Sequence, residues 1–232
     1  MEKMPLRDAF ISRENKFLLL EKGFKKCGYK KDEELLEIGC ARGDAAAYLW
    51  KNGFTRLTST DIDEKAIAEA ERCHSGCRFL RADACDLPFE NESFYGAFSE
   101  AAYSVITDKE KASREYRRIL KPGGKFLLND FCLRDQNARG APETGIPCFQ
   151  GVRTMDEYRE IFENSGFECR YAGEEFPEFI RIAVSLSKIF SVPPGEVGEY
   201  ILKSYGTDSY VSDFFSGFRL SCCQMIFVRS NE

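Results

Sequence analysis

The stretch Leu35-Leu36-Glu37-Ile38-Gly39-Cys40-Ala41-Arg42-Gly43 runs from an apolar segment into a turn of small residues. An alanine-rich segment that begins at Asp44 follows directly. The apolar segment predicts a buried strand, and the alanines predict the start of a helix. Because Gly39, Ala41 and Gly43 keep large side chains out of the turn, its backbone can approach a bound molecule closely. The junction therefore predicts a ligand-binding strand, turn and helix.

The helix that follows this turn argues against a bound dinucleotide. Dinucleotide-binding turns have glycine at the first, third and sixth positions, so that the backbone meets the pyrophosphate. Here these positions are Gly39, Ala41 and Asp44. A carboxylate in the first turn of the helix repels a pyrophosphate, which disfavours NAD and FAD. A nucleotide-dependent oxidoreductase is one hypothesis for the function of the protein, and Asp44 argues against it.

Carboxylates follow the next two predicted strands. Asp61 comes directly after residues 55–60, and Asp83 comes directly after residues 77–82. Asp61 lies about 20 residues beyond the glycine turn, where a carboxylate can accept hydrogen bonds from both hydroxyls of an adenosine ribose. The alternative is a solvated turn aspartate. Asp63 precedes the next predicted helix and is expected to be its N-cap.

Four features, taken in their order along the chain, resemble those of the class I S-adenosylmethionine-dependent methyltransferases, of the small-molecule type with a methyltransferase-11-like domain. Residues 37–43 are similar to the family's first motif, E/D-x-G-x-G-x-G, with alanine in place of the middle glycine. Residues 83–89, Asp-Ala-Cys-Asp-Leu-Pro-Phe, resemble its D-A-x-x-L-P-F segment. Residues 119–126, Ile-Leu-Lys-Pro-Gly-Gly-Lys-Phe, resemble its helix-to-strand turn. Together with Asp61, these matches extend over roughly residues 33–131.

The resemblance implies S-adenosylmethionine as the methyl donor and assigns a role to each matching residue. The glycine turn would hold the methionine end, Asp61 the ribose, and Asp83 with the amide of Ala84 the adenine. The residues expected to bind S-adenosylmethionine are Glu37, Gly39, Cys40, Ala41, Gly43, Asp61, Ile62, Asp83, Ala84 and Ser99.

The resemblance also implies the fold, a doubly wound, Rossmann-like α/β architecture with a helical lid insertion. Its mostly parallel sheet would have seven strands in the order 3-2-1-4-5-7-6, with strand 7 antiparallel. Alternating predicted strands and helices agree with parallel strands joined by right-handed crossovers. We expect a single methyltransferase domain over residues 1–232, with a core at about 33–175 and 219–230, an N-terminal cap helix at about 12–28, and lid insertions at about 132–153 and 176–220.

Both insertions leave the carboxyl ends of predicted strands, which is the edge where open α/β sheets bind ligands. The second insertion is rich in phenylalanine and tyrosine. These rings could enclose an apolar or cationic part of a substrate. Alternatively, they could form the insertion's own small core against the sheet.

Glu100 and Tyr103 follow the fourth predicted strand and are the candidate catalytic residues. Methyl transfer is an in-line displacement, so the protein mainly aligns the reactants and excludes water. A general base is needed only where the acceptor must lose a proton. Glu100 could bind an amine of the acceptor or the ammonium group of the methyl donor, and Tyr103 could line the acceptor pocket. The alternatives are an exposed loop carboxylate and a packed aromatic ring.

Composition and charge narrow the class of substrate and the location. The 232 residues are 43% hydrophobic and 31% charged, which is ordinary for one globular domain. The formal net charge is −5 and no long basic run occurs, so a nucleic-acid substrate is not expected. The chain has no stretch of about 18 apolar residues, and its start does not resemble a signal peptide. We therefore expect a cytoplasmic monomer or homodimer with a small-molecule acceptor and no membrane partner.

The ten cysteines are scattered along the chain, and most are expected to be reduced and buried. The single histidine, His74, lies in a Cys-His-x-x-Cys cluster with irregular spacing, so no metal site is expected. Cys148, considered with Cys40 and Cys132, resembles the placement of a thiol in arsenite methyltransferases, which makes an arsenite- or thiol-type enzyme one alternative function. A non-catalytic S-adenosylmethionine-binding protein is the other.

Overall fold

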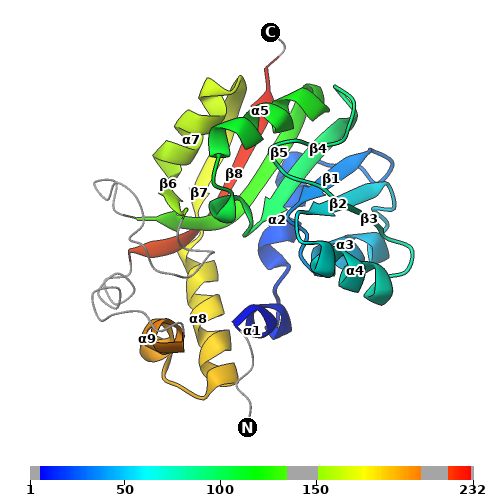
Figure 1. The fold of residues 1–232 in the computed structure, drawn as a ribbon. Coiled ribbons are helices and arrows are strands. Elements are labelled where there is room, and N and C mark those ends of the chain that lie inside the picture. Colours follow the sequence, from blue (N-terminus) through cyan, green and yellow to red (C-terminus); the bar gives the residue numbers. More distant parts are fainter. Residues whose placement is uncertain (1–5, 135–150, 205–218, 231–232) are drawn as a thin grey trace.

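Within residues 6–134, 151–204 and 219–230, which the structure describes, eight strands form one mixed sheet (Figure 1). The structure is a computed structural model. The strands are β1 (Leu35–Ile38), β2 (Leu57–Asp61), β3 (Arg78–Arg81), β4 (Phe94–Glu100), β5 (Leu120–Leu133), β6 (Arg153–Thr154), β7 (Phe167–Glu174) and β8 (Leu220–Arg229). The helices are α1 (Leu6–Ser12), α2 (Leu18–Cys27), α3 (Asp44–Lys51), α4 (Glu64–Cys73), α5 (Lys109–Ile119), α7 (Met155–Asn164), α8 (Phe176–Phe190) and α9 (Val197–Ser204), with short 3-10 turns at Tyr103–Val105 and Pro194–Glu196.

The order of the strands confirms the expected fold. The sheet reads β3-β2-β1-β4-β5-β8-β7, so β8 and β7 take the places of the expected strands 7 and 6. β8 runs antiparallel to both β5 and β7, while the pairs among β1 to β5 are parallel. The two-residue strand β6, which pairs with β5, was not expected from the sequence.

Helices cover both faces of the sheet with apolar side chains. On one face, α5 and α7 contribute Tyr116, Tyr158 and Phe162 to a core that also contains Phe126 and Phe227 of the sheet. On the other face, α2, α3 and α4 pack against Leu35 of β1, Phe98 of β4 and Leu127 of β5. Side chains alternate between the faces along each strand, so these two clusters identify the face to which any strand residue points.

Local sequence signals begin two of the helices as expected. The side chain of Asp63 accepts hydrogen bonds from the amides of Lys65 and Ala66 at the start of α4. Thr154 and Glu157 form a reciprocal capping box at the start of α7. In each case a short polar side chain satisfies amides that have no partner within the helix.

The expected N-terminal cap helix at about 12–28 is wrong as one continuous element, because the structure has α1 and α2 with a break between them. In the break, Asn15 has a φ of 56°, in the left-handed region. Arg13 turns its side chain toward Phe10 O and Glu178 of α8. The break therefore lets the N-terminal segment contact the helices of the second insertion.

The second insertion has a core of its own, where it is described. Ile182 and Leu186 of α8 and Ile201 of α9 pack together with Phe131 and Leu220 at the ends of two strands. This packing favours the structural alternative for the apolar side chains of this insertion. Residues 135–150 and 205–218, which make up much of the two expected lid insertions, lie outside the described residues.

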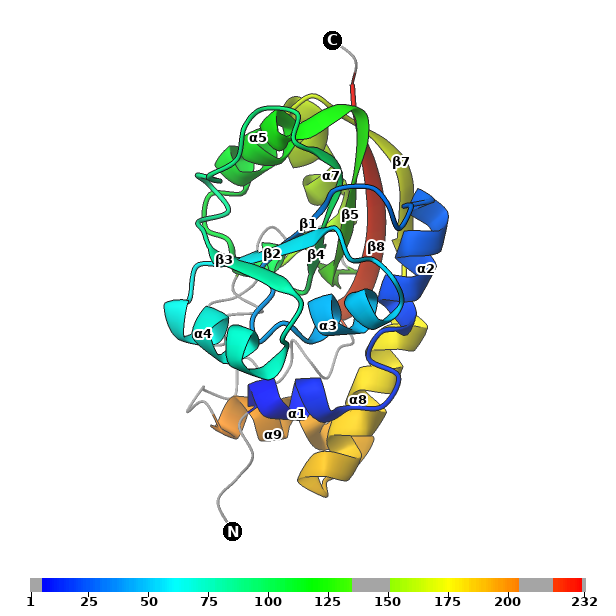
Figure 2. The ribbon, with the colours of Figure 1, turned by 90° about the vertical axis from the view of Figure 1, so that its right-hand side faces the viewer.

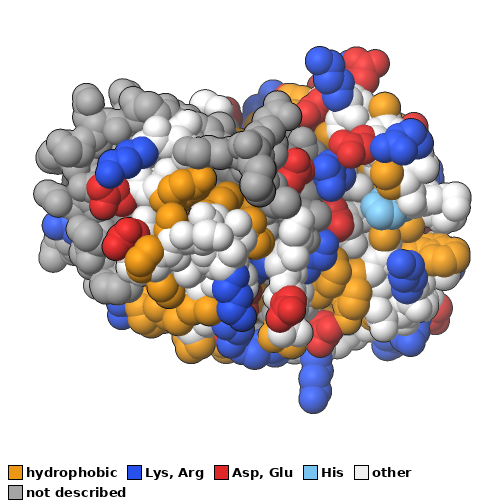
Figure 3. Space-filling view, turned by 90° about the horizontal axis from the view of Figure 1, so that it is seen from below, with side chains coloured by type: hydrophobic (Ala, Val, Ile, Leu, Met, Phe, Trp, Pro, Cys, Tyr) orange, Lys and Arg blue, Asp and Glu red, His pale blue; other side chains and the backbone are white. Residues whose placement is uncertain are grey.

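The helices α1, α8 and α9 lie together beyond the ends of the strands (Figures 1 and 2). Seen from that end, hydrophobic side chains gather among acidic and basic ones (Figure 3). No helix among the described residues is long and apolar enough to cross a membrane.

Candidate functional site

The glycine turn after β1 is held close to two neighbouring strands. The amides of Gly39 and Cys40 both donate to the carbonyl oxygen of Thr60, at 2.8 and 2.9 Å. A Cβ atom on Gly39, whose φ is +80°, would lie 2.3 Å from the Cβ of Ala102, which follows β4. Only glycine fits this position, both for its space and for its backbone conformation. The turn therefore lies directly against the segment that carries Glu100.

Ala41 occupies the middle position of the turn with a φ of 48°. This left-handed conformation costs free energy for a residue with a Cβ, whereas glycine adopts it readily. Backbone strain of this kind persists where neighbouring contacts hold it. The amide of Ala41 has such a contact, because it donates to Oδ2 of Asp61 at 2.7 Å.

Asp61 joins the end of β2 to the glycine turn. Its Oδ2 accepts from Ala41, and its Oδ1 accepts from the amide of Asp63 at 2.9 Å. An ionised carboxylate has about four acceptor sites, so both oxygens can accept further hydrogen bonds. Ile62, the next predicted residue, is 61% exposed.

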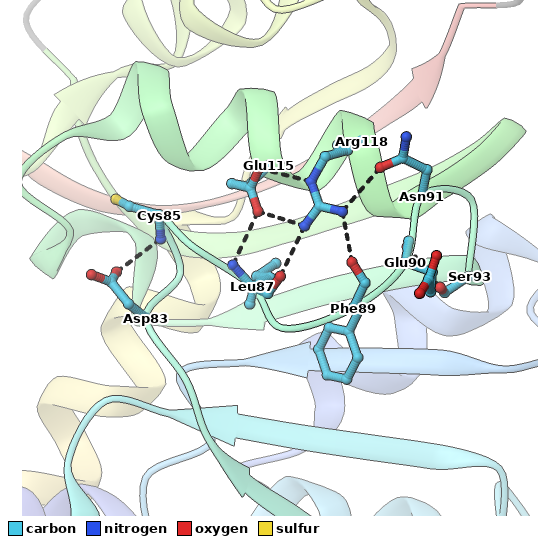
Figure 4. Close-up of polar contacts among 9 residues, drawn as sticks. All are labelled: Asp83, Cys85, Leu87, Phe89, Glu90, Asn91, Ser93, Glu115 and Arg118. Carbon is cyan, nitrogen blue, oxygen red and sulfur yellow. Dashed lines mark hydrogen bonds and ion pairs between the residues drawn. The ribbon is translucent and has the colours of Figure 1, made fainter.

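Asp83 and Ala84 lie after β3 in a segment that α5 holds in place (Figure 4). Oδ1 of Asp83 accepts from the amide of Cys85 at 2.8 Å, which leaves Oδ2 with acceptor capacity. Further along, Arg118 of α5 donates to the carbonyl oxygens of Phe89 and Leu87, at 2.6 and 2.8 Å.

Glu115 completes this anchor of the segment after β3. It accepts from Arg118 at 2.7 Å and from the amide of Leu87 at 3.0 Å. The guanidinium and the carboxylate thus replace backbone partners that an irregular segment cannot supply itself. Neither residue was predicted from the sequence, although Arg118 and Glu115 have the three-residue helical spacing that lets such side chains meet.

Glu37 is a buried acid at the end of β1, next to the glycine turn. It is 2% exposed, and its Oε2 accepts from Ser59 Oγ at 2.7 Å. The pKa of Glu37 is raised from its ordinary value of 4.5 to about 7. Burial is the main cause, the hydrogen bond from Ser59 lowers the pKa, and the nearby Asp61 and Asp44 contribute to raising it. Glu37 therefore holds its proton more tightly than an exposed glutamate does.

Glu100 ends β4 and is held by an amide of the neighbouring strand. Asn129 Nδ2 donates to Glu100 Oε1, and Gln224 Nε2 in turn donates to Asn129 Oδ1 at 2.9 Å. Burial raises the pKa of Glu100 from 4.5 to about 8, although Asn129 lowers it. The half-buried Glu100 is thus no exposed loop carboxylate. Asn129 and Gln224 were not predicted from the sequence, because no local pattern indicates a contact between strands.

Tyr103 requires a correction, because the structure places it in the core. It is fully buried, and its hydroxyl lies 3.0 Å from Lys109 O and 2.6 Å from Ser113 Oγ. Its ring packs against Tyr158 and Phe162. A ring enclosed in this way cannot line an acceptor pocket, so the alternative of a packed aromatic is correct.

Two other predicted residues are also enclosed. Ser99 is fully buried, and its hydroxyl has no hydrogen-bond partner in the part of the chain that the structure describes. Cys40 is 5% exposed within the glycine turn. For these two residues, any contact with a ligand would involve the backbone rather than the side chain.

Ion pairs hold the N-terminal segment beside the glycine turn. Arg42 of the turn pairs with Asp8 of α1 at 3.0 Å, and Lys16 pairs with Asp44 at 2.9 Å. The ammonium group of Lys16 offsets part of the negative charge of Asp44, and it is this charge that disfavours a bound pyrophosphate. The segment therefore covers the turn, as expected of a cap, although in two helices.

The cysteines give the thiol alternative little structural basis. Cys148 lies outside the described residues. Cys132, Cys222 and Cys223 are buried. A hydrogen bond with Cys132 together with burial raises the pKa of Cys223 well above its ordinary value, and burial does the same for Cys222. Cys222 and Cys223 therefore resist forming the thiolate that binds soft metals. Across residues 6–134, 151–204 and 219–230, no group of three or more His, Cys, Asp or Glu side chains could hold a metal ion.

Comparison with known proteins agrees with this geometry. Residues 36–128 match a family model described as a methyltransferase domain. The chain is 33% identical to a phthiotriol/phenolphthiotriol dimycocerosates methyltransferase of Mycobacterium ulcerans over 160 residues, which are 65% of this chain and 58% of that protein. It is 26% identical to an O-methyltransferase of Aspergillus sclerotiorum over 183 residues, which are 74% of this chain and 68% of that protein.

A solved structure shares the fold over nearly the whole chain. It is the phosphoethanolamine N-methyltransferase 2 of Haemonchus contortus in complex with S-adenosylmethionine, with a TM-score of 0.74 and 20% identity. The match covers 97% of this chain and 55% of that one.

The sheet order and the turn that joins β1 to Asp61 define a Rossmann-like methyltransferase fold. Residues 36–128 match a methyltransferase domain, and the fold is that of the class I S-adenosylmethionine-dependent methyltransferases. It spans 58% and 68% of the lengths of the two curated relatives described above.

Proposed function

We propose that the protein is an enzyme that transfers a methyl group from S-adenosylmethionine to a small-molecule acceptor. The observation that carries this proposal is the hydrogen bond between the Asp61 carboxylate and the Ala41 amide. It supports a site in which Asp61 would bind the ribose and the adjacent turn would admit the methionine end of the donor. A binding site for S-adenosylmethionine needs these two parts side by side.

The described residues fit this methyl donor. The oxygens of Asp61 keep acceptor capacity for the ribose hydroxyls, and Oδ2 of Asp83 keeps it for the adenine amino group. The backbone of the turn at Gly39 would face the methionine end. The donor supplies a sulfonium methyl group that reacts by displacement, so these residues need only bind and orient it.

The compared proteins support a small-molecule acceptor but do not select one. Their names refer to methyl transfer to an oxygen, to phthiotriol dimycocerosates and to phosphoethanolamine. These acceptors differ in chemistry, whereas the net charge of −5 on this chain disfavours a polyanionic one such as nucleic acid. The monomeric or homodimeric state and the cytoplasmic location stay predictions.

Glu100 is the residue that we propose to act on the acceptor. It lies beside the turn, since Ala102 two residues later packs against Gly39. It is half-buried, so its carboxyl group can reach a bound molecule. A carboxyl group with a raised pKa is suited to taking a proton near neutral pH.

Calorimetry tests the donor site directly. Asp61→Ala removes the proposed hydrogen bonds to the ribose, and we expect S-adenosylmethionine and S-adenosylhomocysteine to bind about tenfold to a hundredfold more weakly. Asp63→Ala removes a neighbouring carboxylate that caps α4, and it should leave the affinity nearly unchanged. Equal affinity of wild type and Asp61→Ala, or preference for NAD, would contradict the proposed donor site.

Methyl transfer itself is tested with labelled donor and the small-molecule fraction of a cell extract. The expected result is a labelled product that mass spectrometry can identify. Tight binding of the donor without labelled product from any fraction would instead favour the non-catalytic binding protein.

A further inference from the structure

Three polar side chains form a row across neighbouring strands on the face covered by α2. Glu100 of β4 is in register with Asn129 of β5, and Asn129 is in register with Gln224 of β8. Register partners point to the same face of a sheet. The polar row is unusual here, because the residues two positions earlier on β4 and β5, Phe98 and Leu127, belong to the apolar core of that face.

The hydrogen bonds of this row run in one direction. Gln224 Nε2 donates both to the carbonyl oxygen of Leu19 in α2, at 2.8 Å, and to Asn129 Oδ1, at 2.9 Å. A backbone carbonyl can only accept, so this contact fixes the side-chain nitrogen of Gln224 toward α2. The Asn129 oxygen then faces Gln224, and its nitrogen donates to Glu100 Oε1. The row thus requires that Glu100 Oε1 be an acceptor.

Gly23 allows α2 to lie close enough to make this arrangement. A Cβ atom on Gly23 would come within 2.9 Å of Gln224 Nε2 and 2.5 Å of a methyl group of Leu127. Gln224 is fully buried and Asn129 is 2% exposed, whereas Glu100 is half-buried. Gln224 and Asn129 are thus enclosed, and Glu100, beside the glycine turn, is the partly exposed member of the row.

This row is a costly way to fill a sheet face. Buried amides lower stability unless every donor and acceptor is satisfied, and apolar residues would pack there without that requirement. Oε1 of Gln224 has no hydrogen-bond partner in the described part of the chain. This loss of stability is explained if Asn129 and Gln224 have a function that they perform through Glu100.

We propose that Asn129 and Gln224 are positioning residues that hold Glu100 to receive the proton of the methyl acceptor. The inference rests on the proposed function, and it narrows the class of methyl acceptor. The acceptor then carries a proton on its nucleophilic atom, as a hydroxyl group does, and is not a thioether or a tertiary amine.

The proposed step conserves atoms and electrons. A lone pair of the acceptor oxygen forms the bond to the methyl carbon while the sulfur–methyl bond breaks and leaves its electron pair on sulfur. The proton of the hydroxyl passes to the Glu100 carboxylate. Solvent later takes this proton from Glu100, which restores the carboxylate.

The charged groups that face Glu100 come from three other elements. Glu37 of β1 and Asp130 of β5 are acids that disfavour its ionised form, while Arg13, between α1 and α2, favours it. Arg13 is itself ion-paired with Glu178 of α8, at 3.0 Å. These groups are unchanged in the variants used below. Gln224→Glu adds one acid to them, whereas Gln224→Met adds no charge, so a change in Glu100 that both variants share can be assigned to the row.

The test replaces Gln224 and follows the Glu100 carboxyl group by carbon NMR on glutamate-labelled protein. In Gln224→Glu, a carboxyl group carries at most one proton and cannot donate to both the Leu19 carbonyl and Asn129 Oδ1. Asn129 is therefore expected to turn and present its oxygen to Glu100, and any charge on the new acid adds to the upward shift. The Glu100 titration should then move upward by about one pH unit or more. Glu100→Gln identifies the signal, and Asn52→Asp, on the exposed end of α3, is the matched amide-to-acid control.

Gln224→Met serves if Gln224→Glu does not fold, because it removes the donor while keeping the length of the side chain. Asn129 then loses the partner that orients it, and the Glu100 titration should again move upward. An unchanged Glu100 titration in the folded Gln224 variants would overturn the proposal.

The pH profile of labelled methyl transfer separates this inference from the proposed function. The acid limb of the profile should move with the NMR titration in the Gln224 variants and stay in place in Asn52→Asp. If the NMR titration of Glu100 moves but the acid limb of the pH profile does not, Glu100 is not the group that accepts the proton. If the wild-type protein binds the donor but transfers no methyl group, the proposed function is wrong, and so is the proton-accepting role of Glu100. The NMR titration would still decide whether Asn129 and Gln224 position Glu100.

Discussion

Glu37→Gln should make the protein more stable at alkaline pH than the wild type. The neutral amide keeps an oxygen that can accept from Ser59 Oγ, which lies 2.7 Å from Oε2 in the wild type. In the wild type, burial raises the folded-state pKa of Glu37 from 4.5 to about 7. The folded state therefore binds the proton more tightly than the unfolded state, and ionisation of Glu37 costs stability as pH rises through this window.

The size of the effect follows from the two pKa values. A difference of 2.5 pKa units corresponds to about 3 kcal/mol, and the 2% exposure of Glu37 leaves little solvent screening to reduce it. The free energies of unfolding of variant and wild type should nearly agree at about pH 4.5. Their difference should grow to about 3 kcal/mol above about pH 8, where it levels off.

Urea unfolding at a series of pH values, without the methyl donor, measures this difference. Glu71→Gln, on the exposed face of α4, controls for the loss of one carboxylate charge. A Glu37→Gln difference that is constant over the whole pH range would refute the reasoning, because a Glu37 whose pKa differs between the folded and unfolded states must make the difference depend on pH.

The remaining predictions concern the turn and the segment after β3. Gly39→Ala should reduce the affinity for S-adenosylmethionine in calorimetry at least about tenfold, because its Cβ would lie 2.3 Å from that of Ala102 and must displace the turn; unchanged affinity would show that the turn is not the donor site. Arg118→Ala leaves two carbonyl oxygens without their charged donor and should lower the free energy of unfolding in urea by about 1 to 3 kcal/mol. Arg118→Lys should recover only part of this loss, since one ammonium group cannot reproduce the fork of the guanidinium, and full recovery would contradict the proposed geometry.

The parts of the fold that the sequence predicted well have signals within a few residues of one another. Asp63 and the pair Thr154 and Glu157 identify helix starts through side chains that reach their own backbone. The turn at residues 37–43 gave the first strand, its helix and the neighbouring acid Asp61. Each of these predictions depends on spacing along the chain, which a sequence displays directly.

The parts that could not be predicted depend on contacts between distant segments. Asn129 and Gln224 are 95 positions apart, and only the antiparallel register of β5 and β8 brings them together. The break before α2 was missed because Phe17 and Leu18 continue the apolar spacing of a helix across it. Tyr103 has the same appearance in a sequence whether it faces a substrate or the rings of α5 and α7.

The position of β8 in the sheet has a consequence for how the chain folds. β8 consists of residues 220–229, yet it lies between β5 and β7, which are made much earlier. Until β8 is added, the long and mostly apolar β5 has an unpaired edge, and such edges recruit other chains. Pairing over this sequence separation is slow, because a long loop must close before any contact forms. The pairing of β8 with β5 therefore closes the edge along which the unfinished sheet could pair with another chain.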